Sequence, residues 1–219
     1  MAVEEIELKL PATTDHELPD AVARYLEEAN RRIDVLFETE RNKRTPKFIP
    51  SDSELLYAAL ADVTRRDLPL GRVYCEWGSG LGLGTCLAAL LGYEAYGIEI
   101  EPTLADISRE LAENSGIDVK ILEGSYIPEG FESYGGMGGE ELVRPEHFFG
   151  GDGESFAPTY EGMPCPTDEI DVFFVYPYPT EQEFMLELFE ALAADGAIFL
   201  AYYGDGEICC YRKVAESFG

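Results

Sequence analysis

The sequence has few basic residues, few histidines and no long hydrophobic run. Of its 219 residues 43 are acidic and only 16 are Lys or Arg, so the formal net charge is −27. Such a surface repels phosphate backbones and anionic lipid, which disfavours nucleic acid as a substrate. No segment approaches the roughly 18 to 20 apolar residues that span a bilayer, and the N-terminus MAVEEIELKL has acids where a signal peptide has bases. We expect a soluble, cytoplasmic protein with no membrane partner.

Cysteine and histidine are too few and too irregularly spaced for a disulfide framework or a zinc site. The five cysteines are an odd number and include no C-x-x-C pair. His16 and His147 do not fall at zinc-ligand spacing with them, so we predict no structural metal. His147 has no visible partner in the sequence, and we interpret it as incidental rather than as a catalytic base.

Two explanations of the acidity remain open: attraction for a basic partner, or adaptation to a salty cell. The acids are spread along the chain rather than gathered in one run, which favours adaptation to salt. One segment breaks the pattern, RRIDVLFETERNKRTPK at residues 31–47, where basic residues crowd together. A solvated helix end that neutralises nearby acids explains this segment better than an anion-binding patch.

The N-terminal residues 1–70 are predicted to form a strand and two helices that pack on a core. Residues 6–10 alternate apolar and polar side chains like a short edge strand, and apolar residues recur at helical spacing over 18–37. The second helix follows FIPSDSELL, in which Ser51 and Glu54 have the spacing of a capping box.

From residue 71 to residue 219 strands and helices alternate, which is typical of a parallel sheet with crossover helices. The expected strands are 72–77, 95–100, 118–122, 171–176 and 197–202. The expected helices are 82–91, 102–114 and 180–194. This order predicts a doubly wound, mostly parallel α/β sheet.

Two regions depart from this alternation. Residues 124–169, between the third and fourth strands, are far longer than a usual connection and rich in glycine, proline and aromatics. The aromatic residues of this segment indicate that it packs on something; they are Tyr126, Phe131, Tyr134, Phe148, Phe149, Phe156 and Tyr160. Two interpretations of the segment remain open, an ordered lid and a disordered insertion. After the fifth strand only one further strand, around EICCYRKV, is expected. Either the sheet is trimmed there or the N-terminal strand and helices cover that edge.

A glycine-rich loop follows the first core strand. Gly78, Gly80 and Gly82 occupy alternate positions after VYCEW. Ligands of open parallel sheets bind beyond the carboxyl ends of the strands, and glycines there let backbone N–H groups approach a ligand. Leu83 stands where the dinucleotide fingerprint requires its third glycine, which weakens that interpretation.

Several motifs then occur in a recognisable order. EWGSGLG has an acid two residues before its first glycine, YGIEIEP contains Glu99, and VKILEGSY and DEIDVFFVYPYP follow; PKFIPSDSELL lies upstream. In this order the segments resemble motifs I to IV, and the cofactor-closing segment, of class I S-adenosylmethionine-dependent methyltransferases. The resemblance covers roughly residues 46–205, apart from the insertion, and implies a Rossmann-like fold that binds S-adenosylmethionine.

The resemblance implies a set of cofactor-binding residues: Phe48, Ser51, Glu76, Gly78, Ser79, Gly80, Gly82, Glu99, Ile100, Glu123, Gly124 and Ser125. Glu99 would hold the ribose, since a carboxylate can accept from two adjacent hydroxyls. Residues 123–125 would contact the adenine. Glu76 can face the cofactor's ammonium group, although a capping role in the turn would serve equally well.

Tyr176 and Tyr178 are the candidate residues at the methyl-transfer site. They can stack a substrate or hold a cation, while rigid packing beside the two prolines is an equal alternative. Methyl transfer relies on positioning and exclusion of water and needs no dedicated base. Tyr176 stands where enzymes that methylate amide or base nitrogens often carry Asn or Asp, so that chemistry is not implied.

We therefore expect methyl transfer to a protein or small-molecule acceptor, with the insertion and the N-terminal helix forming the acceptor wall. A non-catalytic S-adenosylmethionine-binding module is the first alternative. A nicotinamide-dependent oxidoreductase is the second, and the glycine spacing disfavours it.

Overall fold

The structure, a computed structural model, describes residues 3–11, 18–40, 48–129, 131–136, 139–143 and 157–215. The side chains of residues 40 and 132–143 are not described. Both histidines and most of the basic segment after residue 40 therefore lie outside the described residues, and the predictions made for them are not addressed by the structure.

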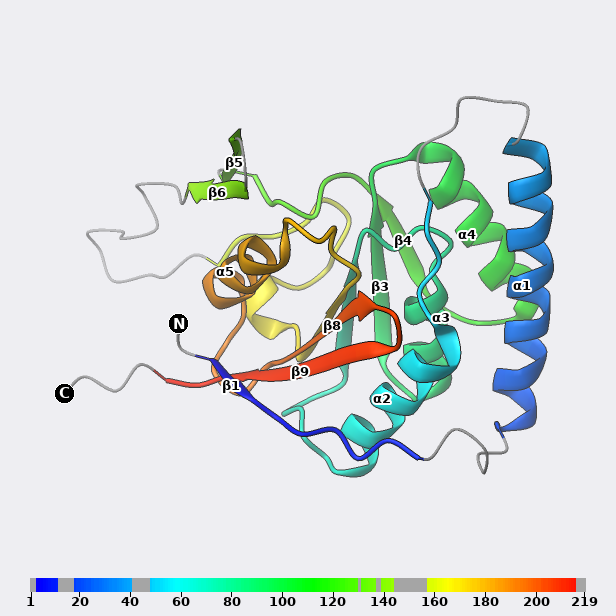
Figure 1. Cartoon of the computed structure of the whole chain (residues 1–219), viewed down its shortest axis with the longest axis horizontal. Coiled ribbons are helices and arrows are strands. Elements are labelled where there is room, and N and C mark those ends of the chain that lie inside the picture. The colour runs from blue at the N-terminus through cyan, green and yellow to red at the C-terminus, as the bar shows by residue number, and fades with distance from the viewer. Residues whose placement is uncertain are drawn as a thin grey trace.

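A seven-stranded sheet runs through the molecule in the order β1-β9-β8-β7-β2-β3-β4 (Figure 1). Its parallel strands are β2 (Val73–Trp77), β3 (Glu94–Glu99), β4 (Lys120–Glu123), β7 (Val172–Val175) and β8 (Ile198–Gly204). Strand β9 (Glu207–Lys213) is antiparallel to β8, and β1 (Val3–Glu5) is antiparallel to β9. The predicted mostly parallel α/β sheet is confirmed, and the five core strands differ from the expected ranges only at their ends.

The direction in which the chain builds the sheet reverses beside β2. From β2 the chain proceeds to β3 and β4, and it then crosses back to add β7 and β8 on the other side of β2. Right-handed crossovers on the two sides of β2 place helices on opposite faces, which makes the fold doubly wound. After the carboxyl ends of β2 and β7 the chain leaves toward opposite faces of the sheet, and α/β sheets bind ligands at such a reversal.

Helices cover both faces of the sheet. One face packs against α2 (Ser53–Arg65), α3 (Leu83–Leu90) and α4 (Pro102–Ser115), and the other packs against α5 (Gln182–Leu192) (Figure 1). Along β2 the side chains alternate between the two cores: Tyr74 belongs to the first, and Cys75 and Trp77 belong to the second. This alternation is the period-two pattern of a strand buried on both faces.

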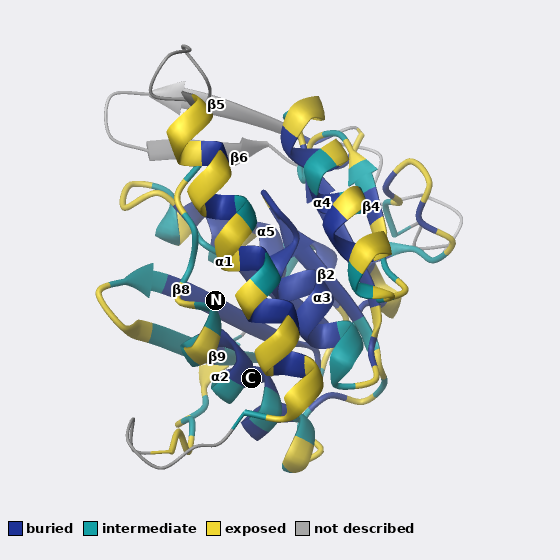
Figure 2. Cartoon of the chain, turned by 90° about the vertical axis from the view of Figure 1, so that its right-hand side faces the viewer, coloured by how far each residue is buried: buried dark blue, intermediate teal, exposed yellow. Residues whose placement is uncertain are grey.

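The N-terminal helix α1 (Asp20–Glu40) forms an outer layer over α3 and α4. Figure 2 shows its exposed side turned to the viewer and a buried stripe beneath it. The buried side chains are Val22, Tyr25, Leu26, Ala29, Ile33 and Leu36. This is the apolar stripe that the sequence predicts. None of the described helices, the 21-residue α1 included, is long and apolar enough to cross a membrane.

The N-terminal strand covers the sheet edge beside β9. Val3 pairs with Lys213, and the ladder ends near the Ile6 N–H, which donates to the Cys210 carbonyl at 2.8 Å. The prediction of a strand over residues 6–10 is therefore wrong, because the strand is Val3–Glu5. The alternation of residues 6–10 instead reflects packing on the core, to which Ile6 contributes.

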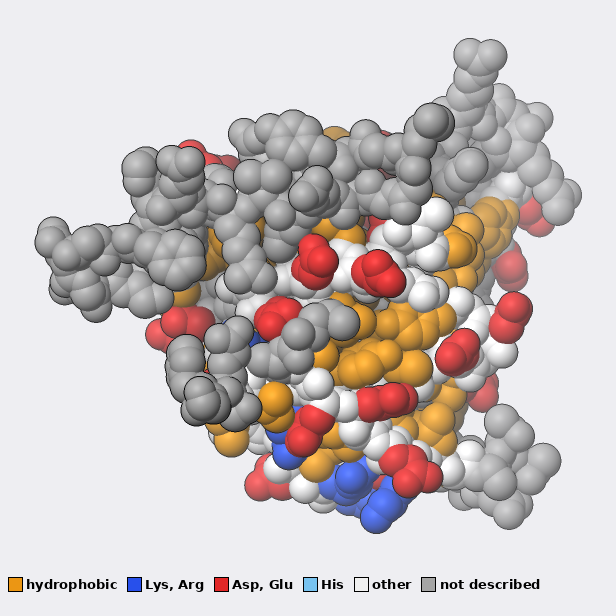
Figure 3. Space-filling view, turned by 60° about the vertical axis from the view of Figure 1, so that its left-hand side comes forward, with side chains coloured by type: hydrophobic (Ala, Val, Ile, Leu, Met, Phe, Trp, Pro, Cys, Tyr) orange, Lys and Arg blue, Asp and Glu red, His pale blue; other side chains and the backbone are white. Residues whose placement is uncertain are grey.

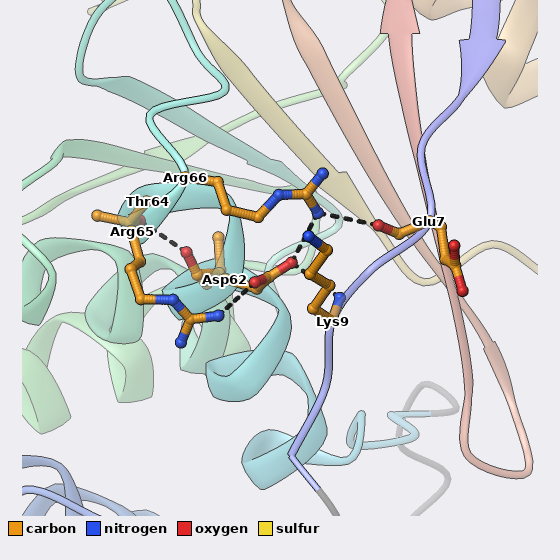
Figure 4. Close-up of polar contacts among 7 residues, drawn as sticks. Glu7, Lys9, Asp62, Thr64, Arg65 and Arg66 are labelled. Atoms are coloured by element: carbon orange, nitrogen blue, oxygen red, sulfur yellow. Dashed lines mark hydrogen bonds and ion pairs between the residues drawn. The ribbon is translucent and has the colours of Figure 1, made fainter.

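Beyond the strand, the end of α2 holds the N-terminal segment (Figure 4). The buried Asp62 carboxylate accepts from the Lys9 backbone N–H at 2.9 Å and pairs with Arg65 and Arg66 at 2.5 and 2.9 Å. Arg66 also donates to the Glu7 carbonyl at 2.9 Å. Side-chain contacts thus replace a β-ladder along this segment.

The start of α2 also differs from the expected capping box. The N-cap residue is Asp52, whose carboxylate accepts from the Leu55 N–H at 3.0 Å, so the prediction of Ser51 as the cap is wrong. Asp and Ser are comparable N-cap residues, and adjacent candidates cannot be distinguished by pattern alone.

The insertion contains structure that the pattern did not predict. It carries a hairpin of β5 (Glu132–Gly136) and β6 (Gly139–Val143), and a short 3₁₀ helix, Thr167–Glu169. Of its aromatics, Phe131 and Tyr160 are buried in the core on the α5 side, and Tyr126 packs against it, as expected. The Tyr134 side chain and residues 144–156 lie outside the described part.

Candidate functional site

A cleft of about 640 Å³ opens at the carboxyl ends of β2, β3 and β7. Its walls come from the segment before α2, the glycine loop, the end of β3, the start of the insertion and the turn after β7. Its size falls in the range of small-molecule sites, and its position is the reversal of the sheet. The described lining residues are Phe48 to Ser51, Glu76 to Gly80, Leu83, Glu99 to Glu101, Leu104, Ser125 to Ile127, Phe174 to Pro179, Glu181, Met185 and Tyr203.

The glycine loop has a shape that only glycine adopts easily. Gly78, Gly80 and Gly82 have φ angles of +67°, +53° and +69°, in the left-handed region. A Cβ on Gly80 would also lie 2.6 Å from the Phe48 ring, and one on Gly82 would collide with the Ser108 hydroxyl. The alternate glycines therefore allow three residues of the loop to adopt a left-handed backbone conformation. They also allow Phe48 and Ser108 to pack closely against the loop.

Glu99 joins this loop to the end of β3. Its carboxylate accepts from the Gly80 N–H at 2.7 Å and from the Glu101 N–H at 2.8 Å. The side chain is 7% exposed and lines the cleft. Because a carboxylate offers about four acceptor positions, two remain for a ligand.

Glu76 lies beneath the same loop, between the cleft and α3. Its carboxylate accepts from the Thr85 backbone N–H at 2.7 Å and from the Thr85 hydroxyl at 2.6 Å. Burial raises the pKa of Glu76 to about 7, against the hydrogen bonds from Thr85 and Gly84, which lower it. Glu76 therefore caps the first turn of α3, which is one of its two expected roles, and it also lines the cleft; its role toward a cofactor stays a prediction.

Nine of the twelve residues expected to bind the cofactor line this cleft; Gly82, Glu123 and Gly124 do not. Gly82 supports the loop from below, where its carbonyl accepts from the Tyr25 hydroxyl at 3.4 Å. Glu123 is exposed, and the Gly124 N–H donates to the Glu99 carbonyl at 2.9 Å. Ile100, in contrast, leaves 72% of its surface exposed at the cleft.

The turn after β7 forms the other end of the cleft. Tyr176 packs edge-on against Tyr202, with ring centroids 4.8 Å apart, whereas Tyr178 is 51% exposed. Burial, then the neighbouring Tyr202 and Asp205, raise the pKa of Tyr176 above 10, so its hydroxyl remains protonated at neutral pH. Tyr176 and Tyr178 both line the cleft, and their role at a methyl-transfer site stays a prediction.

Sequence reasoning missed several residues of the cleft, among them Trp77, Glu101, Tyr126, Glu181 and Tyr203. Trp77 stacks on Tyr126, with ring centroids 6.2 Å apart. Trp77 and Glu101 lie within the quoted motifs EWGSGLG and YGIEIEP, so the sequence could have identified them. The position of Tyr126 could not be predicted from the sequence, because it depends on a distant residue. The Tyr160 hydroxyl, 34 residues further on, donates to the Tyr126 carbonyl at 2.8 Å.

The expected acceptor wall is only partly present. Residues 125–127 of the insertion line the cleft, but none of the described residues of α1 does. The expectation that the N-terminal helix forms this wall is wrong, because α1 packs on α3 and α4. The segment 48–51 before α2 lines the cleft instead.

The charged residues among the described lining of the cleft are all acidic. Glu76, Glu99, Glu101 and Glu181 line it, and no Lys, Arg or His occurs among its described lining residues. Carboxylates in a partly enclosed cleft attract a cationic ligand and repel phosphate. No group of three or more His, Cys, Asp or Glu in the described part of the chain is placed to hold a metal ion, and the absence of a metal from the whole chain stays a prediction.

No protein-family model and no curated protein matches this chain. Its structural neighbours include methyltransferases. A methyltransferase from Geobacter sulfurreducens is 14% identical, with a TM-score of 0.49 over 91% of this chain and 93% of the other. An RNA methyltransferase from Salinibacter ruber, in complex with S-adenosyl-L-homocysteine, is 18% identical, with a TM-score of 0.46 over 80% and 97%. A SAM-dependent methyltransferase from Thiobacillus denitrificans, in the same kind of complex, is 20% identical, with a TM-score of 0.43 over 76% and 54%.

Proposed function

We propose that this chain is an S-adenosylmethionine-dependent methyltransferase that acts on a protein or small-molecule acceptor. The observation that carries the proposal is the cleft at the reversal of the sheet, which joins a glycine loop to four glutamates and has no basic residue among its described lining. When bound, S-adenosylmethionine supplies a methyl group on a positively charged sulfonium. Its ammonium and sulfonium charges are both favoured in such a cleft.

Each part of this cofactor has a suitable counterpart among the lining residues. The acceptor positions left on Glu99 suit the two ribose hydroxyls, and Glu76 suits the ammonium group. Phe48, Ile100 and Ile127 offer apolar surface for a nucleobase. The backbone N–H of Gly80 already donates to Glu99, so the loop and the ribose acid are positioned together before any ligand binds.

The two alternatives are less well supported. A nicotinamide dinucleotide would place its pyrophosphate against the carboxylates, and Leu83 stands in the place of the third glycine of its fingerprint. A non-catalytic cofactor-binding module would have the same cofactor cleft. It is distinguished from an enzyme by turnover: an enzyme incubated with cell extract converts S-adenosylmethionine to S-adenosylhomocysteine, whereas a module retains the cofactor unchanged.

Calorimetric titration with S-adenosylmethionine and S-adenosylhomocysteine tests the proposal. We expect binding of the wild type in the micromolar range, on the order of −8 kcal/mol. Glu99→Ala should bind at least about tenfold more weakly, because charge-assisted hydrogen bonds to the ribose are lost. Glu113→Ala, which removes an exposed acid from α4 away from the cleft, is the matched control and should bind like the wild type.

Thermal unfolding of the unliganded variants is needed beside the titrations, since Glu99 also braces the glycine loop. Absence of binding to either ligand by the folded wild type would overturn the proposal. Tighter binding of NAD⁺ or NADP⁺ would favour the oxidoreductase.

A further inference from the structure

We propose that the methyl acceptor is an aliphatic amine that enters the cleft as a cation, at the end formed by the turn after β7. The proposal rests on the proposed function and adds the class of substrate to it. The defining juxtaposition is Tyr178 beside Glu181, in a cleft that Tyr176 and Tyr203 also line.

The turn that carries Tyr178 and Glu181 is braced by two hydrogen bonds between these residues. The Glu181 N–H donates to the Tyr178 carbonyl at 2.9 Å, and the Tyr178 N–H donates to the Glu181 carboxylate at 3.3 Å. The carboxylate is thereby held close to the backbone that carries the exposed ring. A carboxylate and an aromatic ring carried by one short turn both favour a cation, the first through its charge and the second through the ring quadrupole.

Two further acids lie near the tyrosine hydroxyls but outside the described lining of the cleft. Asp205 and Glu207, in and after the β8–β9 turn, lie close enough to Tyr176 and Tyr203, respectively, to contribute to the raised pKa values of these hydroxyls. On the face drawn in Figure 3, acidic side chains are distributed around exposed hydrophobic ones, and basic side chains gather at the lower edge. An approaching cation is therefore attracted before it makes contact, and an anion is repelled.

An amine fits these features better than other methyl acceptors. A carboxylate acceptor would be repelled by Glu181, and a neutral alcohol would gain little from the acids. A planar amide or base nitrogen is not favoured either, because Tyr176 occupies the position where enzymes of that kind carry Asn or Asp. The aromatic rings of Tyr176, Tyr178 and Tyr203 offer apolar surface for an aliphatic stem.

The proposed methyl transfer to an amine releases one proton. The bound ammonium first loses a proton to water, and the nitrogen lone pair then attacks the methyl carbon of the sulfonium. The carbon–sulfur bond breaks and its electron pair returns to sulfur. The products are a methylated ammonium, the neutral thioether and one proton.

Binding to protein saturated with S-adenosylhomocysteine tests the acceptor class without relying on turnover. Benzylamine, benzyl alcohol and benzoate are titrated as one series, and a lysine-containing peptide is compared with its norleucine analogue. We expect at least one amine to bind about tenfold or more tightly than its neutral analogue, and benzoate to bind most weakly. The benzylamine and peptide arms distinguish a small-molecule source of the amine from a protein source.

Three variants test whether Glu181 and Tyr178 bind the amine. Glu181→Gln keeps an acceptor for the Tyr178 N–H but removes the charge, and should weaken amine binding about tenfold, with the affinity for S-adenosylhomocysteine unchanged. Tyr178→Leu removes an exposed ring and should weaken amine binding about two- to fivefold. Glu183→Gln removes an exposed acid from the first turn of α5, outside the described lining, and should have no effect.

The proposal is overturned if the neutral analogues bind as tightly as the amines in both series, or if Glu181→Gln behaves like Glu183→Gln. Either result leaves the methyltransferase proposal intact, because S-adenosylhomocysteine must already be bound for the titration. Failure of the protein to bind S-adenosylhomocysteine is the separate result that contradicts the proposed function.

Discussion

Glu76 lies buried beneath the glycine loop, and burial raises the pKa of its carboxyl group from 4.5 to about 7. Between about pH 4.5 and pH 7, the folded protein therefore keeps a proton on this carboxyl group that the unfolded chain has lost. The stability associated with this proton is complete below about pH 4.5 and is lost as the pH rises toward 7. At pH 8, where the group is ionised, its contribution makes the free energy of unfolding about 3 kcal/mol lower than with the group protonated.

Glu76→Gln removes this titration and keeps an oxygen that can accept from Thr85. The free energy of unfolding of the variant, relative to wild type, should rise between about pH 4.5 and 7 and level off above that range. Urea unfolding at a series of pH values measures this difference. Glu123→Gln, at an exposed acid, is the control; the same pH dependence in both variants would refute the assignment to Glu76.

Gly80 combines a left-handed backbone with a close neighbour, the Phe48 ring. Gly116 has a similar φ angle of +66° with nothing within 4 Å of its Cβ position. Gly116→Ala should therefore lower the free energy of unfolding by roughly 1–2 kcal/mol through backbone strain alone. Gly80→Ala should cost about 1–3 kcal/mol more, because the new methyl group displaces the ring. Equal losses in chemical denaturation would mean that Phe48 does not pack on the loop as described.

At the scale of elements, Asp62 connects α2 to the N-terminal segment that covers the sheet edge (Figure 4). Burial raises the pKa of its carboxyl group, but the hydrogen bond from the Lys9 N–H and the guanidinium of Arg66 outweigh it, so the pKa is lowered from 3.8. The stability associated with this carboxylate is therefore present above about pH 4 and is lost as the pH falls through the lowered pKa.

Asp62→Asn should lower the free energy of unfolding at pH 7 by about 1–3 kcal/mol, because a buried charged acceptor is removed from three donors. Hydrogen exchange should locate the weakening in residues 3–9 and in β9, since the segment reaches the sheet through Val3–Glu5 and Ile6. Asp67→Asn, at an exposed acid 3.5 Å from Arg72, is the control and should change stability little. Exchange that stays unaltered in residues 3–9 would contradict the role of Asp62.

Regular elements could be predicted from the sequence where one physical signal dominated. The core strands are buried on both faces and the helices carry clear apolar stripes, so their positions follow from hydrophobic pattern. Residues 6–10 were mistaken for a strand because Ile6 and Leu8 pack on the core without forming a ladder. The β5–β6 hairpin was missed because it has little of the apolar alternation that reveals a strand.

The candidate site could be predicted where motifs are local. Glu76, the glycines of the loop and Glu99 all lie between residues 76 and 99 of the sequence, and all of them but Gly82 line one cleft. Tyr126 and Tyr203 reach the same cleft through tertiary contacts between distant segments, which a single sequence does not contain. The assignment of these residues to a cofactor stays a prediction.

On the scale of the whole molecule, the net charge of −27 makes stability depend on salt. Screening shortens the range of repulsion from about 10 Å at 0.1 M salt to about 3 Å at 1 M. The melting temperature should therefore rise over this range of KCl, and NaCl at equal ionic strength should give the same rise. A melting temperature that does not change, or falls, would contradict adaptation to salt as the origin of the acidity.

The crystal structure of the protein with S-adenosylhomocysteine tests the central claim most directly. We predict that the ligand occupies the cleft at the end of β2, with its ribose hydroxyls on the Glu99 carboxylate and its amino group toward Glu76. A ligand bound elsewhere, or a cleft left empty at saturating concentration, would contradict the assignment of this cleft to the cofactor.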